Sequence, residues 1–215
     1  MKTFTKLGFG VLAIASLSLS SCASTYKPLD PPTAPYTFSE KTDGLVYSYQ
    51  YDLLQNKRNK KYAKRETKHL MRVVAVKITN TTDSTISIAN DYKFMLGNAD
   101  VVPVPPAIAA NKLKQGVPIY LLYLLLNVRI TTEENGKETS STFIPTGPPI
   151  AGLNMIIAAN ANRKFKEELI AFDISNKTVA PGETVYGLLT LQTIAPAPIR
   201  IARRNPVGNA QLSTQ

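Results

Sequence analysis

The chain has 215 residues, of which 25 are Lys or Arg and 15 are Asp or Glu, so its formal net charge at pH 7 is +10. Apolar residues make up 44% of the chain, a fraction that excludes an intrinsically disordered protein. One Cys and one His are present, and these counts exclude a disulfide framework and a metal site built from several cysteines or histidines. The composition indicates a basic globular protein of one domain or two small ones.

The first residues have the features of a secretory signal peptide. Lys2 and Lys6 form a positive segment, and an apolar segment of 13 residues follows from Leu7 to Leu19. A helix that crosses a bilayer core needs about 20 apolar residues, so this segment is too short to do so. The sequence predicts a cleaved signal peptide over residues 1–21.

The signal ends in a motif that contains the only Cys of the chain. Leu19-Ser20-Ser21-Cys22 provides an aliphatic residue, two small residues and then the Cys. This motif resembles the lipobox of bacterial lipoproteins, in which the Cys is lipidated and becomes the first residue. The resemblance implies a diacylglyceryl thioether on Cys22 and an acylated amino group, and two or three acyl chains anchor a protein stably. The alternative is a secreted protein without lipid, in which Cys22 is incidental.

The residues after the Cys bear on where such a protein is sorted. In lipoproteins of the enteric type, an Asp directly after the Cys favours the inner membrane, and an acidic signal there directs some lipoproteins to the cell surface. Residues 23–27 read ASTYK and contain no acid. The resemblance therefore implies a lipid-anchored protein on the periplasmic face of the outer membrane.

The chain ends are expected to lie outside the folded core. Residues 22–43 contain four prolines and no apolar period, which predicts an extended Pro-rich tether. At roughly 3.1 Å per residue, such a tether reaches up to about 60 Å from the lipid. The polar residues 205–215 are expected to form a flexible tail.

Several strands with period-two alternation occupy residues 44–204. In residues 45–53, Leu45, Tyr47, Tyr49, Tyr51 and Leu53 alternate with more polar residues, and the tyrosines are expected to pack inward rather than to stack on sugars. Further strands are predicted at residues 70–79, 85–89, 92–96, 101–104, 184–193 and 198–203.

Short strands between Pro, Gly and Asn turns predict a mainly β protein, an antiparallel β-sandwich. The patterns V-x-V-x-I-x-N near residue 76 and V-x-P-G-E-T-V-x-G from Val179 resemble immunoglobulin-like domains of bacterial envelope lipoproteins. The resemblance implies an immunoglobulin-like fold and transfers no catalytic residue. One domain over residues 44–204 is favoured over two.

A helical insertion around residues 107–172 interrupts the strands. Residues 150–172 predict a helix whose core face carries Ile150, Leu153, Ile157, Ala161, Phe165, Leu169 and Phe172. A partner surface is the alternative for this face. Residues 117–128 (VPIYLLYLLLNV) are apolar on nearly every side, which predicts a buried helix. The alternatives are an interfacial or partner-binding segment and, much less favoured by its length, a transmembrane span.

Positive charge is concentrated in residues 57–72, which hold eight cations and one acid, Glu66. Between two strands, this run is expected to be a loop or a strand extension that attracts an anionic lipid, an anionic glycan or an acidic partner protein. The alternative is a solvated hairpin that keeps the protein soluble. The candidate binding residues are Lys57, Arg58, Lys60, Lys61, Lys64, Arg65 and Lys68.

No catalytic constellation is recognisable. His69 lacks a G-x-S-x-G motif and is expected to be a structural or surface residue, and the adjacent acids Glu133-Glu134 and Glu167-Glu168 point apart. No cofactor, metal or nucleic acid is expected. The sequence predicts a non-catalytic, lipid-anchored binding or accessory protein of the cell envelope. The alternatives are an envelope hydrolase with scattered site residues and a structural subunit of an outer-membrane complex.

Overall fold

The computed structural model describes residues 22–42, 44–134 and 136–204. The chain has a mixed α/β fold with antiparallel sheets, with 35% of residues in helices and 34% in strands. The described residues form two compact units: unit 1 contains residues 22–26 and 115–163, and unit 2 contains residues 27–114 and 164–204. The signal peptide expected over residues 1–21 and the tail expected over 205–215 lie outside the described residues.

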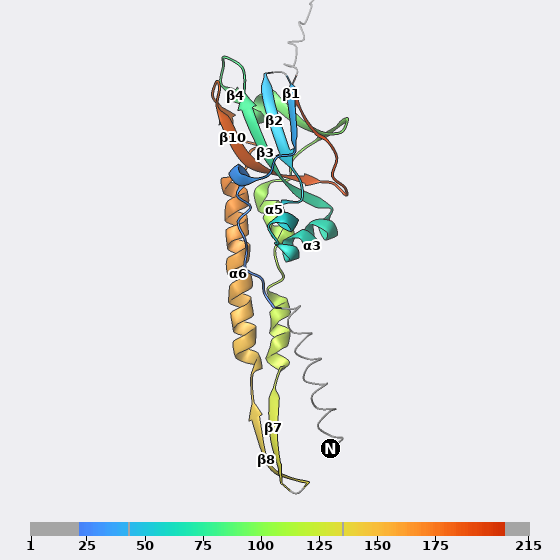
Figure 1. The fold of residues 1–215 in the computed structure, drawn as a ribbon, viewed down its shortest axis with the longest axis vertical. Helices are drawn as coiled ribbons and strands as arrows, with labels where there is room; N and C mark the ends of the chain where they lie inside the picture. The colour runs from blue at the N-terminus through green and yellow to red at the C-terminus, as the bar shows by residue number, and fades with distance from the viewer. Residues whose placement is uncertain (1–21, 43, 135, 205–215) are drawn as a thin grey trace, which may run out of the picture. The chain divides into compact units, whose positions relative to one another are not determined.

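A four-stranded antiparallel sheet forms the main part of unit 2, with strand order β1-β2-β3-β10 (Figure 1). The alternation in residues 45–50 sets the inward face of β2, on which Tyr47 and Tyr49 are buried. The predicted inward packing of the tyrosines is confirmed. The strands are β1 (Phe38–Thr42), β2 (Leu45–Gln50), β3 (Met71–Asn80) and β10 (Thr184–Gln192).

Unit 2 also contains two smaller antiparallel sheets. Strands β5 (Tyr92–Leu96), β6 (Ala99–Val101) and β11 (Ile199–Arg203) form a sheet with order β11-β5-β6. Strand β4 (Ile86–Ser87) pairs with β9 (Thr178–Val179). A single buried cluster contains Tyr47 of β2 and Val76 of β3 as well as Phe94 of β5 and Ile201 of β11, so one core serves the four-stranded and the three-stranded sheets.

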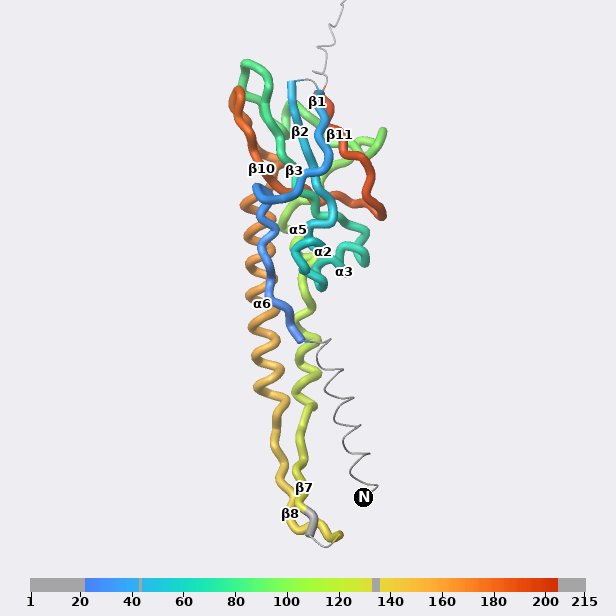
Figure 2. Tube along the Cα trace, in the orientation of Figure 1, coloured from blue at the N-terminus to red at the C-terminus, as the bar shows by residue number. Residues whose placement is uncertain are grey.

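Five short helical segments complete unit 2. The predicted loop or strand extension at residues 57–72 is wrong, because most of this run is helical. Tyr62, Ala63 and Glu66 are buried on one side of the helix that this run forms. Glu66 follows Ala63 by three residues and Tyr62 by four, as expected for residues on the buried face of a helix. The segments are η1 (Pro31–Thr33), α2 (Leu53–Asn56), α3 (Lys60–His69), α4 (Ile88–Asp91) and α5 (Pro106–Leu113) (Figure 2).

Residues 27–42 are folded parts of unit 2 rather than an extended tether. Leu29 is fully buried, and its backbone N–H donates to the Glu168 carboxylate at 2.9 Å. The Lys27 N–H donates to the Asn59 side chain, which in turn donates to the Lys27 carbonyl at 2.7 Å. The sequence shows no regular pattern of apolar residues here, because only a few side chains of this proline-rich segment point inward.

Unit 1 contains a 3-10 helix, a β-hairpin and the first part of a long helix. The carbonyl of Leu126 accepts from the Gly147 N–H at 2.8 Å, and the Gln115 backbone exchanges two hydrogen bonds with the Asn162 side chain at 2.8 and 2.9 Å. These bonds tie residues 115–126 to the helix at two places. The elements are η2 (Pro118–Leu125), β7 (Val128–Glu134), β8 (Lys137–Ile144) and α6 (Gly147–Ala171), whose last residues belong to unit 2.

Helix α6 buries a different face from the predicted one in its first half. The buried residues there are small or polar, whereas Ile150 is 38% and Leu153 60% exposed, so the predicted core role of these two residues is wrong. Small side chains let the neighbouring backbone approach closely, as the Ala23 N–H does when it donates to the Asn154 side chain at 2.6 Å. The predicted face is confirmed at Ala161, Phe165 and Leu169. The buried residues of the first half are Gly147, Ala151, Asn154 and Ala158.

Two glycines at the start of α6 allow a matched test of its packing against η2. A Cβ added at Gly147 would clash with the Tyr123 carbonyl oxygen and lie 2.7 Å from that of Leu124, whereas one at Gly152 meets nothing within 4 Å. We expect Gly147→Ala to destabilise unit 1 by about 1–3 kcal/mol. Gly152→Ala is expected to stabilise the helix by up to about 1 kcal/mol. Urea unfolding followed by circular dichroism measures both changes, and equal effects would contradict the close contact.

Candidate binding surfaces

Helix α3 brings the predicted basic residues together on one surface of unit 2. Lys60, Lys64 and Lys68 are spaced four residues apart and are all exposed, so they lie along one face of the helix. Arg58 is exposed just before the helix, in a left-handed backbone conformation with φ 58°. The basic surface consists of Lys57, Arg58, Lys60, Lys61, Lys64, Arg65 and Lys68.

Contacts on the inner side of α3 hold this surface in place. The Tyr62 ring lies 4.6 Å from the ring of Phe165 in the part of α6 that belongs to unit 2, and both side chains are almost fully buried. Helix α3 also packs against α5 and β3. The cations are therefore presented by an anchored helix rather than by a loop.

Glu66, the one acid of the basic run, does not neutralise the surface, because it is only 2% exposed. Its carboxylate accepts from the Val73 N–H at 2.6 Å. Burial raises the pKa of Glu66 to about 7, an effect that the Val73 hydrogen bond and the nearby Arg72 oppose. Among the residues that the structure describes, no ion pair with a carboxylate involves Arg58, Lys60, Lys64 or Lys68.

His69 follows the basic surface at the end of α3. Its pKa lies below the ordinary value because of partial desolvation and because of the cations Arg65, Lys68 and Lys112. In the described part of the chain, no carboxylate is among the groups that shift this pKa. The charged groups that act on His69 are therefore cations, as expected beside the basic surface.

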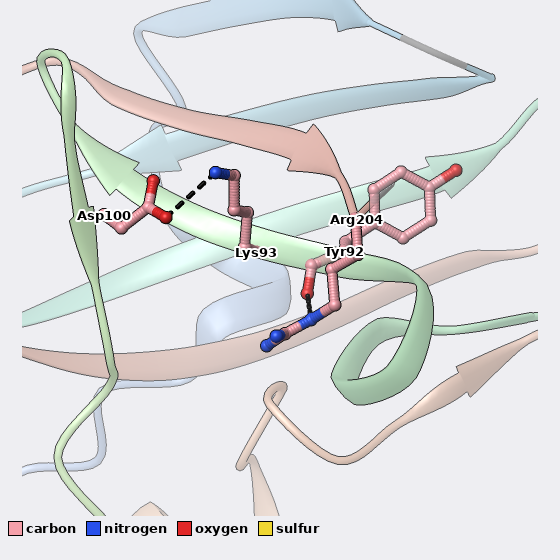
Figure 3. A network of polar contacts seen from close by, with 4 residues as sticks. All are labelled: Tyr92, Lys93, Asp100 and Arg204. Carbon is pink, nitrogen blue, oxygen red and sulfur yellow. Dashed lines mark hydrogen bonds and ion pairs between the residues drawn. The ribbon is translucent and has the colours of Figure 1, made fainter. Parts of the chain in front are cut away.

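A pocket of about 280 Å³ lies elsewhere in unit 2, between the segments near Tyr92, Pro103 and Asp173. The Asp173 carboxylate already accepts from the Ser175 N–H at 3.0 Å and the Asn176 amide at 3.1 Å. Figure 3 shows Arg204 donating to the Tyr92 carbonyl at 2.9 Å beside the Lys93–Asp100 ion pair on strands β5 and β6. These contacts link neighbouring segments of unit 2. No cluster of three metal-ligating side chains occurs in residues 22–42, 44–134 and 136–204.

Unit 1 carries a second candidate surface, which is apolar. The predicted burial of residues 117–128 is wrong, because this segment forms η2 with Leu122 62% and Leu125 77% exposed, while Tyr120 is buried. The exposure of this segment agrees with the alternative of an interfacial or partner-binding segment. Within the described residues, no helix is long and apolar enough to cross a membrane.

Cys22 is the first described residue and its thiol is exposed. The two residues after it are bound within unit 1: Ala23 by Asn154, as above, and Ser24 by the Gln115 side chain. Gln115 accepts from the Ser24 N–H at 3.2 Å and donates to the Ser24 carbonyl at 2.7 Å. The chain after Cys22 is therefore attached to unit 1 at once, without a spacer.

Comparisons with known proteins give no relative from which a function could be transferred. The chain matches no protein-family model, and no curated protein or solved structure is significantly similar to it. The features that bear on function are therefore the two surfaces and the motif at Cys22.

The sequence identified the basic residues, whereas exposure of the apolar residues of unit 1 was only the alternative to their burial. The signal was present, because residues 115–128 and 145–162 contain no Asp, Glu, Lys or Arg. Two uncharged segments that flank a polar hairpin have no charged face to turn toward water, which indicates a surface that is covered in the cell.

Proposed function

We propose that this protein is a non-catalytic, lipid-anchored cell-envelope protein that binds an anionic envelope component through the basic surface of unit 2. The lipobox-like segment that ends at Cys22 supports the anchor. The same resemblance favours the periplasmic face of the outer membrane. The component that fits the basic surface carries phosphate or carboxylate groups, as anionic lipids, envelope glycans and acidic proteins do.

The observation that carries this proposal is the arrangement of charge on α3. Three lysines at four-residue spacing face solvent, and the acid among them is buried with a raised pKa. A surface that only keeps a protein soluble commonly mixes both signs of charge, because neighbouring acids reduce repulsion. The single sign of this surface favours an anionic partner.

We further propose that unit 2 is an immunoglobulin-like β-sandwich. The single core that contains residues of the four-stranded and the three-stranded sheets supports a sandwich. The resemblance of the V-x-V-x-I-x-N and V-x-P-G-E-T-V-x-G segments supports the immunoglobulin-like assignment. In this arrangement the sheets form a scaffold, and α3 presents the cations.

Charge removal on α3 tests the proposed binding. We expect the triple substitution Lys60→Gln, Lys64→Gln, Lys68→Gln to weaken binding to vesicles that contain phosphatidylglycerol. A basic residue near an anionic membrane contributes about 1 kcal/mol, so three account for a loss on the order of 100-fold. Flotation of a chain from residue 22 with Cys22→Ser, which has no acyl chain, measures this loss at several salt concentrations.

The matched control removes three exposed cations from the strands of the same unit. Lys41 lies on β1, and Arg200 and Arg203 lie on β11, so their replacement by Gln changes the net charge equally and leaves α3 intact. We expect the control to keep most of the binding. Equal losses in both triple variants would show that net charge, rather than the surface of α3, causes the binding.

A further inference from the structure

The apolar surface of unit 1 is made by large side chains from three elements. Leu121, Leu122, Leu124 and Leu125 of η2 are between 46% and 77% exposed. On α6, Ile150, Leu153 and Ile156 are 38%, 60% and 61% exposed. Leu153 and Ile156 lie on the side of the helix away from the buried Ala151 and Ala158, and Ile150 lies at the edge of this side. The base of the hairpin adds Val128, Ile130 and Ile144 on one face of the strand pair, whereas the exposed Phe143 lies on the other face.

The backbone of this unit also indicates that the surface is covered. Strands β7 and β8 form a two-stranded sheet to which no third strand is added among the residues that the structure describes. All eight side chains of β8 are exposed. A two-stranded hairpin is marginally stable in water by itself, and it gains stability when its apolar side packs on something else.

The position of Cys22 identifies what covers the apolar surface. The Ala23 N–H donates at 2.6 Å to the side chain of Asn154, which lies on the buried side of α6 at the same level along the helix axis as the exposed Leu153 and Ile156. Ser24 is fixed to Gln115, at the start of the uncharged segment that contains η2. Cys22 is itself part of unit 1, so a bilayer that takes up acyl chains on Cys22 adjoins this unit.

We infer that the apolar surface of unit 1 lies in the interface of the bilayer that holds the acyl chains of Cys22. The inference rests on the lipid anchor of the proposed function and adds a second, protein-mediated contact with the same membrane. Leucine and isoleucine side chains of η2 and α6 enter the boundary between head groups and acyl chains, as the apolar faces of interfacial helices do. The contact of η2 and α6 is expected to depend little on lipid charge, because residues 115–128 and 145–162 contain no Asp, Glu, Lys or Arg.

The absence of Trp from the chain provides a direct test. Leu122→Trp in η2, Leu153→Trp in α6 and Val102→Trp in unit 2 each introduce a single fluorophore at an exposed apolar position. The full protein is purified from bacterial membranes in detergent and reconstituted into phosphatidylcholine vesicles that contain a lipid-borne quencher. We expect a blue-shifted emission and strong quenching for the two unit 1 probes, greatest with a quencher about 5–10 Å below the surface.

The Val102→Trp protein gives the background value, because Val102 is 87% exposed on unit 2. Quenching of the two unit 1 probes that does not exceed this background would overturn the inference. A blue shift that grows with protein concentration without lipid quenching would also overturn it, because a second copy of the chain would then cover the surface.

The intact mass of the same samples separates this inference from the proposed anchor. Quenching of an unacylated protein would refute the anchor and retain the membrane contact of unit 1. An acylated protein without quenching of the unit 1 probes would retain the anchor and refute the contact. The two probes lie on different elements at positions 62% and 60% exposed, so both substitutions are compatible with the fold.

Discussion

Replacing Phe165 by alanine is expected to lower the free energy of unfolding by about 3–5 kcal/mol. Phe165 is fully buried, and its ring packs against Tyr62 on the inner side of α3. The substitution leaves a cavity between the two helices and removes an aromatic contact. Guanidinium unfolding measured by circular dichroism gives the change in free energy.

The control for Phe165 is Ile170→Ala on the same helix. Ile170 is 51% exposed, so its truncation is expected to cost less than about 1 kcal/mol. Because Phe165 supports α3, Phe165→Ala is also expected to weaken binding to anionic vesicles, whereas Ile170→Ala is not. A loss of stability at Phe165 no larger than that at Ile170 would contradict the packing of α6 against α3.

Replacing Glu66 by glutamine is expected to stabilise the protein at pH 8 by on the order of 2–3 kcal/mol. Burial raises the pKa of Glu66 from 4.5 to about 7. Between these two pH values the folded state keeps a proton that the unfolded state has released, so the free energy of unfolding falls as pH rises and levels off above pH 7. The glutamine side chain stays neutral and removes this fall, while its amide oxygen still accepts from the Val73 N–H.

Glu66→Ala separates the charge from the hydrogen bond. Alanine also removes the charge, but it leaves the buried Val73 N–H without its acceptor, which costs about 1–3 kcal/mol. Thermal unfolding of the three proteins from pH 4 to 8 gives the profiles. A Glu66→Gln protein whose stability falls with pH as steeply as that of the parent would show that Glu66 is not the cause.

The sheets of unit 2 could be predicted largely from the sequence. The alternation in residues 45–50 and 71–79 directly reflects the side-chain period of a strand, and the structure forms β2 and β3 there. The predicted edge strand at residues 101–104 is displaced to Ala99–Val101, before Pro103, because proline cannot donate to a ladder. The predicted strand at residues 85–89 shortens to Ile86–Ser87, because α4 begins at Ile88.

The helical parts were harder to predict, because their buried faces are not marked by large apolar residues. In α3, the inward side consists of Tyr62, Ala63 and the acid Glu66, so the basic run lacks a clear apolar stripe. In α6, alanines are buried and the larger Leu153 is exposed, so the size of the apolar side chains did not indicate which of them are buried. For residues 117–128, high apolarity suggested burial, although an apolar segment beside a membrane is expected to be exposed in the isolated chain.

The intact mass of the protein purified in detergent from bacterial membranes tests the lipid anchor most directly. We expect a chain that starts at Cys22 and carries the added mass of a diacylglyceryl group and an acyl group, and we expect Cys22→Ser to abolish this addition. A chain that retains residues 1–21, or that starts elsewhere with an unmodified Cys22, would contradict this expectation.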